Sequence, residues 1–193
     1  VIVDGTSQSG ASCGDLWSGA SPVLKVRLDG NTSSFHGITV QADNVTVKGL
    51  SITRFNRGVS TQAVSDSTII QCNYLGLEPD DTLQGFSGTL ASAAWLGGNG
   101  TLLGGNVAGE GNVIATGGAV NRFGVMTDTD STNTMIRGNF IGTDSTGMSA
   151  RATWMALTHL NGGGSWSDVS NNLISGTTNT AGAVALGSDD TMS

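Results

Sequence analysis

The chain is poor in charged residues, prolines, aromatic residues and cysteines. Charged residues make up 12% of its 193 residues and there are only 2 prolines, which excludes a charge-rich disordered tail and a proline-rich linker. Its 8 Lys and Arg against 15 Asp and Glu give a formal net charge of -7, and no basic cluster could track a phosphate backbone, so we expect no nucleic-acid partner. No apolar run approaches the roughly 18 residues that a membrane-spanning helix needs, so we expect no membrane span.

What the chain does have is turn-forming residues at regular intervals. Its 30 glycines, with many Ser, Thr and Asn residues, separate short apolar runs, which is typical of an all-β protein. One phrase recurs between the turns: Thr or Ser, a few further residues, then Gly, Cys or Asn before an Asn and two apolar residues. Copies lie at 68–76, 134–142 and 167–175, a split copy at 101–105 and 112–115, and a degenerate copy at 46–52. Such self-similarity predicts a solenoid, because one turn cannot bury its apolar face without a neighbour.

Aligned copies of the phrase predict three columns of identical or similar side chains. Stacked at the strand spacing of about 4.8 Å, aliphatic residues would fill the interior and each Asn amide would bond to the next along the axis. The two aliphatic columns are Val47, Ile70, Leu103, Ile136 and Val169, and Ile52, Leu75, Ile114, Ile141 and Ile174. The structural asparagine column is Asn73, Asn112, Asn139 and Asn172, with Leu50 in the first copy.

The spacing of the copies predicts three strands per turn. The shortest intervals, from residue 50 to 73 and from 112 to 139, suit three short strands and three bends, which is the turn of a parallel β-helix. We expect the third strand to begin near Gly37, Gly58, Gly124 and Gly182, and to lie within 90–96 and 154–160 in the other two turns. The prediction is one all-β domain of about six to seven turns, with its longest loops after Gly76 and Gly142.

Three stretches carry a resemblance to a known family. They are 139–147, the alternation of 103–105 with 111–114, and the opening 3–8 with 28–30. Together they resemble the right-handed parallel β-helix repeats of large bacterial secreted and cell-surface proteins. The resemblance implies export and a surface or adhesin-like role. We interpret residues 1–193 as a single β-helix segment of a longer chain.

The two cysteines leave two interpretations open. Cys13 and Cys72 lie far apart in the sequence, and neither has a second Cys or His at metal-ligand spacing. A disulfide requires the insert that carries Cys13 to fold along the stack. Otherwise Cys72 fills a small-residue position that Gly49, Gly105 and Gly138 occupy in other copies.

No constellation of catalytic residues stands out. Parallel β-helices include polysaccharide lyases, glycoside hydrolases and epimerases, so a carbohydrate-active enzyme is the first alternative. Glycoside hydrolysis needs two carboxylates that face the scissile bond. Besides Asp189 with Asp190, the acidic pairs are Asp80 with Asp81 in a loop, and Asp128 with Asp130. We place the second pair on one strand, facing outward, where it is a weak candidate for a Ca²⁺ site. We assign no catalytic residue and no cofactor, and favour a non-catalytic protein.

The candidate ligand-binding residues are two tryptophans and three loop aspartates. Exposed Trp can stack on sugar rings, whereas buried Trp packs under loops. The candidates are Trp95, Trp154, Asp80, Asp81 and Asp144, with contact through the loops at 76–90 and 142–152. The expected function is an extracellular scaffold that binds glycans or other surface proteins. A self-assembling filament is the second alternative, because open turns at both ends would expose strand edges to end-to-end association.

Overall fold

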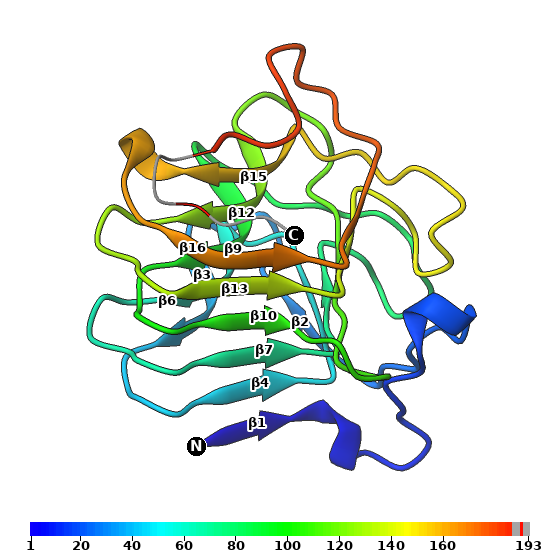
Figure 1. Cartoon of the computed structure of the whole chain (residues 1–193). Helices are drawn as coiled ribbons and strands as arrows, with labels where there is room; N and C mark the ends of the chain where they lie inside the picture. Colours follow the sequence, from blue (N-terminus) through cyan, green and yellow to red (C-terminus); the bar gives the residue numbers. More distant parts are fainter. Residues whose placement is uncertain (187–189, 191–193) are drawn as a thin grey trace.

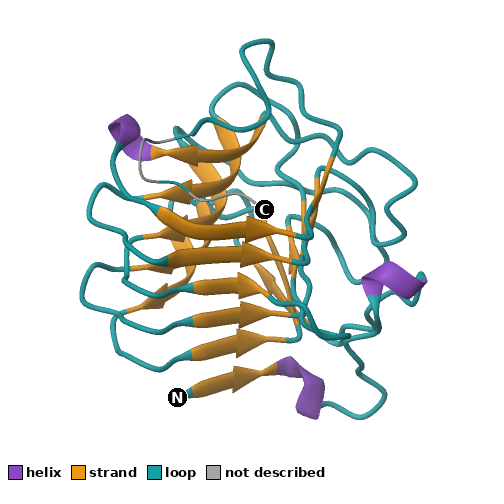
Figure 2. Cartoon of the chain, in the orientation of Figure 1, coloured by secondary structure: helices purple, strands orange, loops and turns teal. Residues whose placement is uncertain are grey.

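The computed structural model describes residues 1–186 and residue 190, and it is built from three parallel sheets (Figures 1 and 2). The first sheet contains β1 (Ile2–Asp4), β4 (Thr46–Lys48), β7 (Ile69–Gln71), β10 (Leu102–Gly104), β13 (Thr134–Arg137) and β16 (Trp166–Ser170). The second contains β2 (Val26–Asp29), β5 (Leu50–Thr53), β8 (Tyr74–Leu75), β11 (Val113–Ile114), β14 (Phe140–Ile141) and β17 (Leu173–Ile174). The third contains β3 (His36–Val40), β6 (Arg57–Thr61), β9 (Ala91–Leu96), β12 (Arg122–Thr127) and β15 (Met155–His159).

Each of the first five turns contributes one strand to each sheet in order, and the sixth contributes β16 and β17, so the fold is a parallel β-helix, as the repeats predict. Six strands in the first sheet correspond to six turns. Residues 187–189 and 191–193 of the predicted segment lie outside the described residues. The helices of the described part are the three 3₁₀ turns η1 (Gly5–Ser7), η2 (Leu16–Ser18) and η3 (Leu160–Gly162), and none of its helices is long and apolar enough to cross a membrane (Figure 2).

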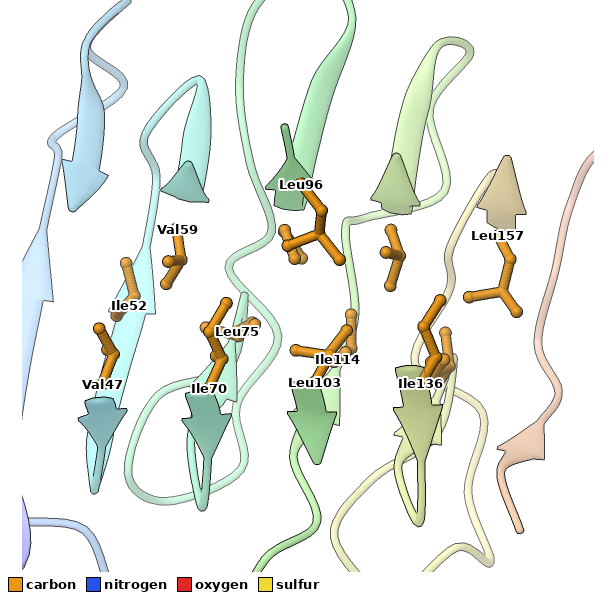
Figure 3. Packing of buried hydrophobic residues seen from close by; sticks show 14 of the residues in the cluster. Val47, Ile52, Val59, Ile70, Leu75, Leu96, Leu103, Ile114, Ile136 and Leu157 are labelled. Carbon is orange, nitrogen blue, oxygen red and sulfur yellow. The ribbon is translucent and has the colours of Figure 1, made fainter. Parts of the chain in front are cut away.

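The two predicted aliphatic columns are confirmed and form the core. Val47 pairs with Ile70, Ile70 with Leu103, and the column continues through β13 and β16 in the same register. In the second sheet Ile52 pairs with Leu75, and that column continues to β17. The two columns face each other across the interior, where the third sheet adds a further aliphatic column (Figure 3). Truncation of one such residue to Ala would cost about 2 to 5 kcal/mol, because the stack leaves little room to collapse.

The third strand forms near the predicted glycines and segments in the first five turns. The segment predicted at 90–96 is β9, and that predicted at 154–160 contains β15. In the described part of the sixth turn, up to residue 186, the predicted strand near Gly182 appears as a single parallel bridge between Val184 and Leu157.

The asparagines of the repeated phrase lie one above another at the bend between the first and second sheets. Nδ2 of Asn112 donates to Oδ1 of Asn139 at 2.9 Å and to the carbonyl of Ile70 at 2.8 Å. The backbone N–H of Asn112 donates to the same Oδ1 at 3.1 Å. In the second turn Leu50 takes the place of the asparagine, and its backbone N–H donates to Oδ1 of Asn73 at 3.1 Å. Each amide thus satisfies backbone groups that the bend would otherwise bury unpaired.

An excursion of residues 5–25 separates β1 from β2 and covers the outer side of the second sheet. It is fastened by a disulfide between Cys13 and Cys72, with a Cα–Cα distance of 5.3 Å. Leu16 and Leu24 of the excursion are buried in a second apolar cluster, together with Tyr74, Val113 and Phe140, among others. Both interpretations of Cys72 are therefore correct: the residue is buried at the bend, and it forms a disulfide with Cys13.

Candidate functional site

The two loops predicted to contact a ligand, 76–90 and 142–152, pack against each other. The backbone N–H of Ser145 donates to both carboxylate oxygens of Asp81 at 3.3 Å, and its hydroxyl donates to Oδ2 at 3.4 Å. Nε of Arg151 donates to the backbone carbonyl of Asp81 at 3.3 Å. Burial raises the pKa of Asp81, although the Ser145 N–H and the Arg151 charge oppose that shift. Asp81 therefore joins one loop to the other.

Asp144 and Asp80 are also engaged within their own loops. Asp144 is 6% exposed, and its Oδ1 accepts from the Thr146 hydroxyl at 2.8 Å and from the N–H groups of Met148 and Ser149 at 3.1 and 3.2 Å. Burial acts to raise the pKa of Asp144, but these hydrogen bonds outweigh it and leave the pKa below its ordinary value. Asp80 is exposed, and it accepts from the backbone N–H of Thr82 at 3.0 Å.

Trp95 and Trp154 belong to another part of the molecule. Trp95 is 5% exposed: the guanidinium of Arg57 lies over its ring at 3.2 Å, and its Nε1 donates to Oδ2 of Asp128 at 3.0 Å. Trp154 is half-buried with its ring edge-on to Phe123 at 5.1 Å. Both pack in an apolar cluster of the third sheet, away from the loop aspartates. The structure does not bring the five predicted ligand residues together.

The prediction that Asp128 and Asp130 share a strand is wrong. β12 ends at Thr127, so both aspartates lie in the turn that follows. The carboxylate of Asp128 accepts hydrogen bonds from Nε1 of Trp95 and from the backbone N–H of Thr129, the latter at 2.8 Å from Oδ1. Within the described ranges, no three His, Cys, Asp or Glu side chains are grouped so that they could hold a metal ion.

His159 lies in a chain of hydrogen bonds that resembles a catalytic triad. Its Nδ1 is 2.6 Å from the hydroxyl of Thr127 and its Nε2 is 2.8 Å from Oδ2 of Asp190, while its ring stacks on Trp166 at 4.1 Å. Thr127 is fully buried, so its hydroxyl is closed to a substrate. These hydrogen bonds join Thr127, His159 and Asp190 inside the stack of turns.

Sequence reasoning missed a cluster of charges around Arg27. Nε of Arg27 contacts Oε2 of Glu78 at 2.6 Å, and its NH2 group contacts Oδ2 of Asp29 at 2.7 Å; Arg54 also pairs with Asp29. Hydrogen bonding from Arg54 lowers the pKa of Asp29 to about 2, whereas burial raises the pKa of Glu78 despite the Arg27 charge. Arg27, Glu78 and Asp80 line an open hollow of about 520 Å³. Alternation along β2 places Arg27 and Asp29 on one face, but nothing in the sequence indicates Glu78 as their partner.

A second hollow, of about 220 Å³, lies at the bend that carries the asparagines, and we call it the Trp17 hollow. Its floor is Gly105, Gly138 and Asn171, the residues that follow β10, β13 and β16 in successive turns. Its walls are the segment 106–108 with Gly111, and the indole of Trp17. Two of the three floor residues are glycines, so no side chain from them fills the hollow. At Gly138, with φ of 65°, an added Cβ would lie 2.0 Å from the carbonyl oxygen of Gly105.

Local interactions hold both walls of the Trp17 hollow. Cys72 occupies the same bend position one turn before the floor, so the disulfide fastens the excursion beside the hollow. The Asp15 carboxylate accepts from the backbone N–H of Trp17 at 3.2 Å and begins η2. In the opposite wall, Oε2 of Glu110 accepts from the N–H of Val107 at 3.0 Å. Asn171 donates from Nδ2 to Oδ1 of Asn106 at 3.1 Å and so ties that wall to the floor.

The sequence contains a partial signal for this hollow. The split copy of the phrase shows that 106–111 interrupts a turn, and the matching position of Cys72 shows where the bend runs. The disulfide and the burial of Leu16 and Leu24 bring Trp17 to that bend, and the sequence left the disulfide undecided.

Comparisons with models of known protein families, with curated proteins and with solved structures found no match to this chain. The arrangement of the three sheets places the chain in the class of parallel β-helix proteins.

Proposed function

We propose that this chain is a non-catalytic extracellular scaffold, adhesin-like, that binds glycans at the surface of its loops and excursion. The observation that carries the proposal is the Cys13–Cys72 disulfide. Disulfides of this kind form and persist in oxidising compartments, which supports a secreted or cell-surface location.

The architecture supports a scaffold role. Continuous aliphatic columns and the bonded asparagines make every turn depend on its neighbours, which favours a stiff rod with loops displayed along its side. In the loops at 76–90 and 142–152, Asp81 and Asp144 support loop geometry. Their exposed rims, with Asp80 and Met148, then serve as contact surface.

A glycan array probed with the purified, oxidised chain tests this proposal, with release of reducing ends from the same polysaccharides measured in parallel. Binding without turnover would support the scaffold. Turnover would overturn its non-catalytic character, and an array without any signal would refute glycan binding.

A carbohydrate-active enzyme is the second candidate, and the Arg27 cluster favours it. Two carboxyl groups with pKa values displaced in opposite directions are the arrangement in which one acts as acid and the other stays ionised. Glu78 and Asp29 have that relation beside an open hollow. If turnover is found, Glu78→Gln should abolish it while Asp80→Asn, at the same hollow, should leave it largely intact. Equal activity in Glu78→Gln would exclude this cluster.

A further inference from the structure

The four tryptophans differ sharply in exposure, and the most exposed of them, Trp17, lines a hollow that opens to solvent. Trp17 is 58% exposed, Trp95 is 5% exposed and Trp166 is fully buried, while Trp154 packs edge-on against a neighbouring ring. The ring of Trp17 packs perpendicular to the ring of Phe140, with centroids 5.0 Å apart and planes at 88°. An exposed indole fixed in this way is a platform for a flat, partly apolar ligand.

The lining of the Trp17 hollow is mixed: Trp17, Val107 and Ala108 are apolar, Asn106 and Asn171 are polar, and none of the lining side chains is charged. Two side-chain amides, Asn106 and Asn171, and the peptide carbonyls of the lining glycines provide its hydrogen-bonding capacity, since the N–H groups of Gly105 and Gly138 already donate to the carbonyls of Arg137 and Ser170. The carboxylate of Glu110 lies beside Gly105, where an added Cβ would be 2.1 Å from Oε2, and that oxygen accepts from the N–H of Val107. No Lys or Arg lines the hollow, and the chain carries a net charge of -7, so an anionic ligand is disfavoured.

The size of the hollow restricts the ligand further. Its volume of about 220 Å³ lies below the roughly 300 to 1,000 Å³ of pockets that take drug-sized molecules. One ring fits this space better than an extended chain segment. A pyranose combines the required features, since it has an apolar face for an indole and hydroxyls for amides and peptide groups.

We infer that the Trp17 hollow is a subsite for one neutral pyranose ring of a glycan, stacked on the indole of Trp17 and hydrogen-bonded by the bend residues and by Asn106. This inference rests on the proposed function and names where, and for which sugar class, that function is carried out.

Titration of ¹⁵N-labelled protein with the methyl glycosides of glucose, galactose and mannose tests the subsite directly. The indole N–H resonance of Trp17, assigned with Trp17→Phe, should shift in a saturable way with roughly millimolar affinity, as one small ring allows. The indole resonances of Trp95, Trp154 and Trp166 should remain in place. If none of these glycosides shifts the Trp17 resonance, or if the shift occurs at Trp154 instead, the inference is overturned.

Two variants separate loss of the platform from damage to the fold. Trp17→Ala should weaken glycoside binding by about tenfold or more, as removal of a central aromatic anchor does. Ala108→Gln should weaken binding comparably by filling the hollow from an exposed wall position, without any change at Trp17. Phe35→Ala, which removes another exposed aromatic ring, should have no effect. Full binding by Ala108→Gln would overturn the inference even if Trp17→Ala failed to fold.

The same variants distinguish failure of the subsite from failure of the proposed function. If the unaltered chain binds on a glycan array and Trp17→Ala binds equally well, glycans bind elsewhere and only the subsite is refuted. If the unaltered chain neither binds on the array nor responds to methyl glycosides, both the proposed function and the subsite are refuted.

Discussion

The two ends of the second sheet use polar side chains in opposite ways. The Trp17 hollow borders the start of β11, β14 and β17, and its lining has no ionisable group. The loops at 76–90 and 142–152 follow β8 and β14 at the other end, and they carry Asp80, Asp81 and Asp144. At the loop end, Asp81 and Asp144 are enclosed by hydrogen bonds from the loops themselves. At the other end, the short insert 106–111 carries one acidic residue, Glu110, and leaves open space beside Trp17.

The difference shows that acidic residues in the loops of a solenoid serve first as loop structure. A long loop must satisfy its own backbone N–H groups, and a carboxylate is the strongest acceptor that a chain can supply for them. Open space remains at the glycine-lined bend, where the insert 106–111 is short. The predictions below separate the two ends of the sheet, from the largest effect to the smallest.

Removal of the disulfide should have the largest effect and should act on the hollow end alone. The double variant Cys13→Ala, Cys72→Gly is expected to lose about 4 kcal/mol of unfolding free energy, because the link closes a long loop. Glycine suits position 72, whose φ is 58° and whose equivalents include Gly49 and Gly138. Urea unfolding measures the loss, and the Trp17 indole resonance should report a loosened wall. Unchanged glycoside binding in this variant would show that packing alone holds the excursion.

Interruption of the asparagine column should lower the stability of both ends of the second sheet. Asn139→Ala removes the acceptor of two Asn112 donors and the donor to the Leu103 carbonyl, all buried, so a loss of about 3 kcal/mol is expected. Asn106→Ala is the matched control: its side chain is exposed with one described partner, Asn171, and a change within about 0.5 kcal/mol is expected. A loss in Asn139→Ala no larger than in this control would show that the column contributes little.

The sequence predicted the repeating part of the molecule well, and the reason is physical. Each turn must bury an apolar residue at the same two positions, so every copy of the phrase has an aliphatic residue equivalent to Ile70 and another equivalent to Leu75. These equivalent residues reveal the register of the strands. The features that occur once were harder to predict. The end of β12 at Thr127 depends on tertiary pairing, and it leaves both Asp128 and Asp130 outside the strand on which they were predicted. The burial of Trp95 depends on Arg57 from a neighbouring turn, which no local pattern indicates.

Removal of the Asp144 carboxylate should loosen the loop end and leave the hollow unaffected. Asp144→Ala leaves the N–H groups of Met148 and Ser149 and the Thr146 hydroxyl without this acceptor, and a cost of about 1 to 2 kcal/mol is expected. Hydrogen exchange should speed up in 142–152, while the Trp17 indole resonance should stay in place. Asp80→Ala, which removes an exposed carboxylate, is the control. A shift of the Trp17 resonance in Asp144→Ala would show that the two ends are coupled.

A fall in pH should have the smallest effect on the free energy of unfolding, and it should again act at the end of the second sheet that carries the loops. The pKa of Asp29 is lowered to about 2 by its hydrogen bond with Arg54, so its stabilising contribution is complete above pH 3.8 and is lost as the pH falls through 2. Unfolding free energy should fall across this window, and Asp29→Asn should flatten that fall. Methyl glycoside binding measured from pH 4 to pH 8 should stay constant, because no group that lines the Trp17 hollow titrates. A tenfold change in that affinity would mean that an ionisable group reaches the bound sugar.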